Sequence, residues 1–156
     1  MALPVPPIGY LRFEITDLKL APGAREPAII ELQANKKPST TNQPMTYKRF
    51  EDLPVWNEAM RLAHCVFDLT ENPRFKISFS LRDQIERSVM SISDNVAEGF
   101  ERGTTNELPA FLHIARGSAG ETRSKLCFME QRPRLADFKS EIADLKLLAE
   151  SCSRQF

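Results

Sequence analysis

The sequence predicts an all-α protein, an up-down-up-down antiparallel four-helix bundle with a poorly structured, proline-rich N-terminal extension. After residue 47, apolar residues recur at intervals of three and four over four separate segments, which is the period of an amphipathic helix with one buried face. The connections between these segments are short, and short connections favour antiparallel neighbours. A chain of 156 residues has room for one domain and an appendage. We therefore expect an extension over residues 1–46 and a bundle over residues 47–156.

The extension differs in composition from the bundle. Seven of the eleven prolines lie within residues 1–46. Alternating apolar residues between 13 and 20 suggest a strand, and residues 28–32 could be its partner across Pro22-Gly23. Because a lone hairpin is marginal in water, we expect weak structure here or docking onto a partner. Residues 35–44 have the composition of a linker. The alternative is that the extension forms a folded subdomain.

The first helix is expected over residues 52–71. Asp52 is a suitable N-cap, and Pro54 is tolerated in a first turn. The helix should end before Asn72-Pro73, because the residue before a proline resists helical geometry. Trp56 is interpreted as a core anchor. Together with it, the apolar face comprises Val55, Ala59, Met60, Ala63, Val66 and Phe67.

The second helix is expected over residues 80–102 and carries the most regular pattern in the chain. Its apolar stripe consists of Leu81, Ile85, Val89, Ile92, Val96 and Phe100. Gly99 lies at the edge of this stripe. Glycine costs about 1 kcal/mol relative to alanine inside a helix, so its presence indicates that a neighbouring helix approaches closely.

A line of polar side chains runs beside that apolar stripe. It steps along the second helix at helical intervals through Gln84, Arg87, Ser91, Asn95, Glu98 and Arg102. With Gly99, and with Ser118 and Glu121 of the next helix, we call it the polar seam. The interpretation is an assembly seam, in which Ser91 and Asn95 bond near Ser118 and Glu121 or to another subunit and help to fix register and oligomeric state. The alternative is a ligand or nucleic-acid site.

The third and fourth helices are expected over residues 105–131 and 135–153, separated by Pro133. Thr104 to Glu107 resembles a capping box that starts the third helix. Gly117 and Gly120 suit close helix packing better than a phosphate loop, because no strand precedes them. The apolar stripe of the fourth helix comprises Phe138, Ile142, Leu145, Leu148, Ala149 and Cys152.

Composition and isolated reactive residues argue against several classes of function. The formal net charge is zero, which argues against strong non-specific polyanion binding but leaves a local basic patch open. Cys65, Cys127 and Cys152 are isolated and are interpreted as reduced, small apolar residues. His64 and His113 lack ligands at metal-binding spacing, so no metal site is expected. No apolar run could span a bilayer and no signal peptide is evident, so a cytoplasmic location without a membrane partner is expected.

No catalytic constellation appears in the sequence. Asp94 and Glu98 are four residues apart, but Arg102 follows Glu98 at the same spacing and no histidine or nucleophile accompanies them. A structural ion pair or an inter-helix hydrogen bond is therefore the expected role of Glu98. We expect a protein that is not an enzyme and uses no cofactor.

The expected topology places the first and third loops at one end of the bundle. That end, which we call the basic rim, would carry six basic side chains against four acidic ones, and the opposite end would be net acidic. Any nucleic acid is expected to meet the rim, and the alternative is an ordinary solvated loop end. The six basic residues are Arg74, Lys76, Arg82, Arg132, Arg134 and Lys139.

Three motifs in order resemble a known family. They are Phe50-Glu-Asp-Leu-Pro-Val-Trp56, the stretch from Ser91 to Arg102, and the stretch from Phe111 to Glu121. They are similar to the bacterial four-helix-bundle family that includes proteins encoded in intervening sequences of large-subunit ribosomal RNA genes and the accessory protein of diversity-generating retroelements. The resemblance covers about residues 47–150. Thr122 stands where a larger aliphatic residue is usual in that family.

The resemblance implies an all-α bundle that commonly assembles as a homopentamer and has no known enzymatic activity. It also implies a largely uncharacterised role, with nucleic-acid binding proposed and, for the retroelement member, interaction with a reverse transcriptase. The expected function is a non-enzymatic, homopentameric scaffold that assembles with itself and binds another protein, with residues 1–46 as the candidate contact. The alternative is an RNA- or DNA-binding accessory protein that acts through the basic rim and partners nucleic acid or a nucleic-acid enzyme.

Overall fold

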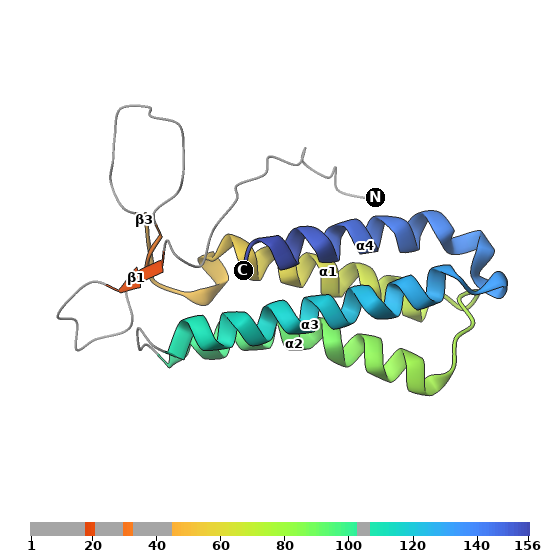
Figure 1. Ribbon diagram of the computed structural model, residues 1–156, viewed down its shortest axis with the longest axis horizontal. Coiled ribbons are helices and arrows are strands. Elements are labelled where there is room, and N and C mark those ends of the chain that lie inside the picture. Colours follow the sequence, from red (N-terminus) through yellow and green to blue (C-terminus); the bar gives the residue numbers. More distant parts are fainter. Residues whose placement is uncertain (1–17, 21–29, 33–44, 103–106) are drawn as a thin grey trace, which may run out of the picture.

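Four long helices form the body of the protein (Figure 1). The structure, a computed structural model, describes residues 18–20, 30–32, 45–102 and 107–156. A short 3-10 helix, η2, precedes the first long helix, and a second, η3, leads into the last one. In chain order the helices are η2 Phe50–Asp52, α1 Pro54–Glu71, α2 Phe79–Glu101, α3 Glu107–Glu130, η3 Pro133–Phe138 and α4 Lys139–Arg154.

The helices run alternately in opposite directions. Figure 1 shows the α1–α2 connection and η3 together at one end, with the start of α1 and the end of α4 at the other. Each helix packs against the next in sequence, and α1 also contacts α4, which closes the bundle. The predicted all-α, up-down-up-down architecture is thus confirmed.

Two of the expected helix starts are wrong. Asp52 is the last residue of η2 and caps nothing with its side chain, because α1 begins at Pro54 with Leu53 in the N-cap position. The fourth helix begins at Lys139 rather than 135, since Pro133–Phe138 forms a 3-10 turn with non-helical backbone angles at Leu135. For α2, the Ser78 hydroxyl accepts a hydrogen bond from the amide of Leu81, at 3.3 Å. The proposed capping box at 104–107 lies mostly outside the described residues.

The expected apolar stripes converge on one core. Its largest fully buried side chains come from all four long helices, and burial of this kind contributes roughly 25 cal/mol per Å² of apolar surface. Trp56 is half-buried and packs edge-on against Phe50, with ring centroids 5.3 Å apart. The fully buried set includes Leu62, Val66, Ile85, Val89, Ile92, Val96, Leu126, Met129 and Ile142.

Gly99 marks the closest approach between α2 and α3. A Cβ atom at this position would lie 2.7 Å from Phe111 Cβ and 3.1 Å from Leu108 Cδ1. Only a residue without a side chain fits so close to a neighbouring helix. By contrast, a Cβ atom at Gly117 or Gly120 would meet nothing within 4 Å among the described residues. The expectation that these two glycines serve close packing within the chain is therefore wrong.

Three short strands form an antiparallel sheet of order β1-β2-β3: β1 Leu18–Leu20, β2 Ile30–Leu32 and β3 Met45–Tyr47. Leu18 pairs with Leu32, and Ile30 pairs with Tyr47. The β1–β2 pair is the hairpin that the alternation suggested. β3 was not expected, because three residues are too few to show alternation. The sheet lies at the end of the bundle where α1 begins (Figure 1). The rest of the extension, including the whole linker at 35–44, lies outside the described residues.

Candidate functional site

The inner half of the polar seam joins α2 to α3 within one subunit. The hydroxyl groups of Ser91 and Ser118 are 2.9 Å apart and hydrogen-bonded. The amide nitrogen of Asn95 donates to the Ser91 carbonyl at 2.6 Å and lies 3.1 Å from the Ser91 hydroxyl. Ser91 thus bonds across to Ser118 as the sequence suggested, whereas the bonds of Asn95 stay on its own helix.

A second hydroxyl pair lies deeper between the same helices. Thr122 Oγ1 is 3.0 Å from Ser88 Oγ, and both side chains are buried. Each hydroxyl also bonds a carbonyl of its own helix, Ser88 that of Ile85 and Thr122 that of Ser118. Buried polar groups cost free energy unless they are hydrogen-bonded. Because both hydroxyls are hydrogen-bonded, the buried side chains of Ser88 and Thr122 avoid this cost.

Sequence reasoning missed the Ser88–Thr122 pair, although a signal was available. In antiparallel helices, moving three residues back on α2 corresponds to moving about four residues forward on α3. Starting from the expected contact of Ser91 with Ser118, that step leads to Ser88 and Thr122. Thr122 is also smaller than the residue usual at its position in the family. A small hydroxylated residue there leaves room for a hydrogen bond to a hydroxyl of the neighbouring helix.

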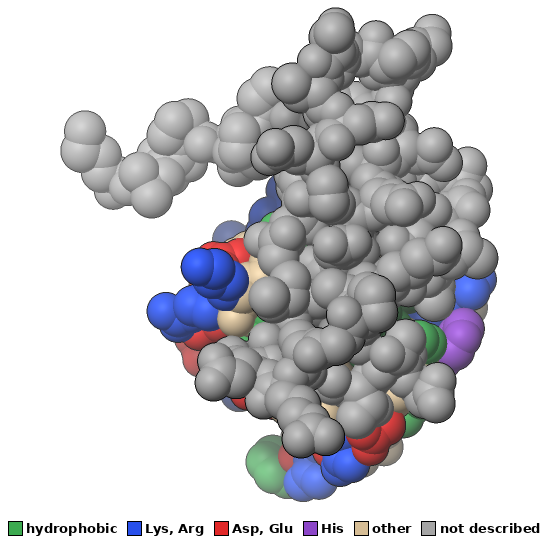
Figure 2. Space-filling model, turned by 90° about the vertical axis from the view of Figure 1, so that its left-hand side faces the viewer, with side chains coloured by type: hydrophobic (Ala, Val, Ile, Leu, Met, Phe, Trp, Pro, Cys, Tyr) green, Lys and Arg blue, Asp and Glu red, His purple; other side chains and the backbone are tan. Residues whose placement is uncertain are grey.

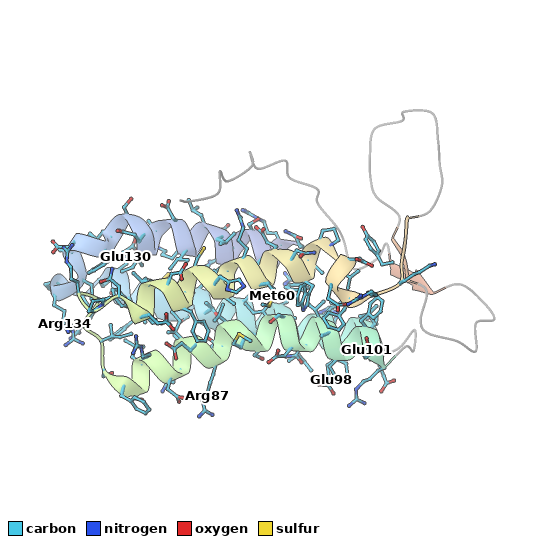
Figure 3. The ribbon with its side chains drawn as sticks, turned by 180° about the vertical axis from the view of Figure 1, so that it is seen from behind. Met60, Arg87, Glu98, Glu101, Glu130 and Arg134 are labelled. Atoms are coloured by element: carbon cyan, nitrogen blue, oxygen red, sulfur yellow. The ribbon has the colours of Figure 1, made fainter. Side chains whose placement is uncertain are left out.

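The outer half of the seam faces solvent. Figure 3 shows Arg87 and Glu98 pointing away from the other helices. Arg87 pairs with Asp83 at 2.9 Å, and Glu98 pairs with Arg102 at 2.7 Å. Glu121 pairs with Lys125 on its own helix and does not join Ser91 or Asn95, while Gln84 is exposed. The Arg87–Asp83 and Glu98–Arg102 pairs are exposed, and exposed pairs contribute about 0–1 kcal/mol each. The ion pair expected for Glu98 is confirmed, and the seam divides into a packed half and a solvated half.

Arg102 covers the tight contact around Gly99. Its guanidinium lies 4.9 Å from the centroid of the Phe111 ring and also pairs with Glu107 at 3.2 Å. The hydrogen bonds that Arg102 donates to Glu98 and Glu107 raise the pKa of its guanidinium. The end of α2 is thereby joined to the start of α3 by charge as well as by packing.

Among the described residues, ion pairing leaves the basic rim with four unpaired cations against one unpaired carboxylate, Glu71, whereas the residue count is six against four. Arg74 pairs with Asp137 at 3.7 Å, and Arg82 pairs with Glu86 at 3.3 Å. Two acidic residues expected to offset the rim are paired as well, Asp83 with Arg87 and Glu130 with Lys146. In Figure 3, Arg134 lies at the extreme end of the bundle. Across the described ranges, four cations of the rim have no ion-pair partner: Lys76, Arg132, Arg134 and Lys139.

The opposite end is less one-sided than expected. Arg49 pairs with Glu51, and Arg154 pairs with Glu150 at 2.9 Å. Figure 2, which faces this end, shows basic and acidic side chains beside one another at the margin. The coloured part of this surface is therefore mixed in charge rather than an acidic patch.

A groove of about 710 Å³ lies between α1 and α4. Leu147 contributes an apolar wall and is 63% exposed. Asp68, Glu141 and Asp144 also line the groove and have no ion-pair partner in the part of the chain that the structure describes. We call this feature the α1/α4 groove. Sequence reasoning missed it, because a groove follows from the spacing of two helices and not from the pattern of either one.

The thiols near this groove are not activated. Cys65 lines the groove, and partial burial raises the pKa of its thiol. Cys152 is fully buried, and burial raises its pKa to about 12. Because the thiolate is the nucleophile, neither cysteine is prepared for covalent chemistry. The interpretation of Cys152 as a small apolar core residue is confirmed, whereas Cys65 is exposed.

The outward side of α3 forms a contrasting surface. Ile114 is 52% exposed, and Gly117 leaves open space beside it. Arg116 and Arg123 are exposed and have no ion-pair partner among the described residues. We call Ile114, Arg116, Gly117 and Arg123 the α3 outer face.

The described residues offer neither a metal centre nor a membrane-spanning helix. They contain no group of three or more His, Cys, Asp or Glu side chains that could hold a metal ion. No helix among them combines the length and apolar character needed to cross a membrane.

Comparison with known proteins gives one match. No curated protein and no solved structure matches the chain. The family model described as 23S rRNA-intervening sequence protein matches residues 51–155. That span includes all four long helices and both hydroxyl pairs between α2 and α3. On this match, which covers well over half of the chain, the protein belongs to the family of 23S rRNA-intervening sequence proteins.

Proposed function

We propose that the protein is a non-enzymatic scaffold that assembles with copies of itself into a homopentameric ring. The observation that carries the proposal is the presence of two unlike, complementary surfaces on one subunit, the α3 outer face and the α1/α4 groove. Contacts between unlike surfaces run head to tail, and such contacts close into rings when the rotation between subunits permits. The number five comes from the family resemblance.

Shape and charge both support this pairing. The α3 outer face offers exposed Ile114 and two cations, Arg116 and Arg123, that no described carboxylate pairs with. The α1/α4 groove offers exposed Leu147 beside three carboxylates that have no ion-pair partner among the described residues. Its two arginines, Arg61 and Arg154, are paired with Glu58 and Glu150. Gly117 has room for a close approach by another backbone. An apolar centre with opposite charges around it is the usual anatomy of a specific interface.

The absence of enzymatic activity is part of the proposal. Asp94 and Glu98, the paired carboxylates of α2, are both exposed, and Glu98 is paired with Arg102. A general acid or base normally has a pKa moved toward neutrality by burial or by a neighbouring charge. The exposed setting of these carboxylates favours a structural role.

Mixing two variants tests the head-to-tail arrangement. Ile114→Arg damages the α3 outer face, and Leu147→Arg damages the groove. Each variant alone should be monomeric. In a mixture, the intact face of the Leu147→Arg subunit can still enter the intact groove of the Ile114→Arg subunit. Because the two surfaces left over on this heterodimer are both damaged, it cannot extend further, and the mixture should stop at heterodimers.

Asp94→Arg is the matched control, since it changes an exposed helical side chain outside both surfaces. This variant should assemble like the wild type. Full-size rings from either single variant, or from the Leu147→Arg and Ile114→Arg mixture, would rule out the proposed contact.

A second candidate function is RNA or DNA binding through the basic rim, with a nucleic-acid enzyme as an alternative partner there. Four rim cations without ion-pair partners among the described residues favour it. A ring of parallel subunits would present five such sets on one face, and linked weak sites gain strongly in avidity. Binding of a labelled RNA should weaken steeply with salt, and combining Arg132→Ala with Arg134→Ala should flatten that dependence. No binding at low salt would end this candidate.

A further inference from the structure

Two phenylalanines at the basic rim are left in water. Phe79 is 84% exposed and Phe128 is 50% exposed. We propose that the basic rim binds single-stranded nucleic acid, with bases stacking on Phe79 and Phe128 and phosphates contacting the unpaired cations. This inference rests on the second candidate function above and names its ligand class.

Phe79 stands at the start of α2, at the end of the bundle that holds the rim. A single exposed apolar side chain needs no explanation by itself. The surroundings of Phe79 make it informative. Lys76 precedes it by three residues, is exposed, and has no ion-pair partner within the described part of the chain. A ring face and a phosphate-binding cation are therefore carried by the same short stretch.

Phe128 repeats this combination on α3. The guanidinium of Arg132 lies 5.3 Å from the centroid of the Phe128 ring. This cation–π contact orients both groups without neutralising the charge, because the described residues supply no carboxylate for Arg132. One pair thus offers an oriented aromatic ring beside a cation that is free to meet a phosphate.

The combination suits a single strand better than a duplex. Bases of a duplex are stacked inside the helix, whereas an unpaired strand exposes its base faces to aromatic side chains. The rim cations are spread over helix ends and connections, from Lys76 before α2 to Lys139 at the start of α4. They do not form one helical face that could enter a major groove. Stacking tolerates any base, so sequence preference should be weak.

Fluorescence anisotropy with labelled oligonucleotides tests the inference. The probes are a thymidine homopolymer, a uridine homopolymer of the same length, a duplex, and an abasic strand with the same number of phosphates. The two homopolymers should bind similarly, and the duplex and the abasic strand should bind more weakly. Phe79→Leu and Phe128→Leu should each weaken homopolymer binding at least about five-fold, from the stacking energy of one base. The salt dependence should stay unchanged, since no phosphate contact is removed.

Controls separate stacking from folding and assembly. Phe79→Tyr keeps a ring and should bind like the wild type. Light scattering should give both leucine variants the wild-type mass, and a loss of assembly would overturn the inference by assigning Phe79 or Phe128 to a subunit interface.

The experiment distinguishes a failure of base stacking from a failure of nucleic-acid binding as a whole. If the abasic strand binds as well as the homopolymers, and both leucine variants bind normally, the stacking inference is wrong. Loss of binding in the Arg132→Ala, Arg134→Ala double variant would then leave the second candidate function standing. If no probe binds at low salt, both are wrong.

Discussion

At the scale of single residues, Gly99 is the position where the contact between α2 and α3 tolerates least change. An added Cβ would lie 2.7 Å from Phe111 Cβ, an atom fixed to its own backbone that cannot turn aside. Overpacking of this kind costs about 1–3 kcal/mol, while alanine's better helix propensity returns about 1 kcal/mol. Gly99→Ala should therefore lower the free energy of unfolding, by about 1 kcal/mol net, as measured by urea denaturation.

Gly120→Ala is the matched control. A Cβ at this position meets nothing within 4 Å among the described residues, so the propensity term stands alone and stability should rise by up to about 1 kcal/mol. Changes of the same sign in the two variants would contradict the close approach at Gly99.

Burial of Cys152 predicts a fall in stability at alkaline pH. Its thiol has a pKa raised from 9.0 to about 12 in the folded protein by burial. Between those values the unfolded chain releases a proton that the folded chain keeps, so stability decreases as pH rises. From pH 8 to pH 10 the loss from this group should be about 1.4 kcal/mol.

Urea denaturation at the two pH values, in wild type and in Cys152→Ala, isolates this contribution from other titrating groups. The variant should lose less stability than the wild type over the same interval. Equal losses would show that the Cys152 thiol reaches solvent.

Some residue roles could be predicted from the sequence and others could not. Ile85, Val89 and Ile92 are fully buried, as their helical spacing indicated, because periodicity reports directly which face is apolar. The prediction of close helix packing at Gly117 was wrong. In a sequence, a glycine on an outer face looks the same as a glycine at a close helix contact. Only the neighbouring helix distinguishes Gly99 from Gly117.

At the scale of helices, the two hydroxyl pairs join α2 to α3. A double-mutant cycle on Ser91→Ala and Ser118→Ala should give a coupling energy of about 0.5–1.5 kcal/mol, because their hydroxyls bond directly. The same cycle on Ser91→Ala and Glu121→Ala should give a value near zero, since Glu121 pairs with Lys125 instead. Equal couplings in the two cycles would contradict the division of the polar seam.

The helices themselves were largely predictable, whereas their ends were not. Long amphipathic segments carry several turns of pattern, so α2 begins within one residue of its expected start and ends within one of its expected end. Short elements lack that redundancy. The 3-10 turns at Phe50–Asp52 and Pro133–Phe138 shifted the starts of α1 and α4, and β3 is only three residues long.

At the scale of the whole molecule, ion pairing determines which charged side chains remain available at each end of the bundle. The chain is neutral overall, yet the basic rim keeps four cations without ion-pair partners among the described residues, while the opposite end is mixed. Loop positions alone identified the rim. The α1/α4 groove and the proposed match to the α3 outer face required three-dimensional structure, because they depend on distances between helices that are far apart in sequence.

The mass of the protein in solution distinguishes the proposed five-membered ring from a single subunit. Multi-angle light scattering at micromolar concentration should give five times the protomer mass of 17.7 kDa. High salt should reduce the mass only in part, because it screens the charged contacts but leaves the apolar contact of Ile114 and Leu147 in place. A mass of 17.7 kDa at low salt would contradict the proposed assembly and, with it, the scaffold function.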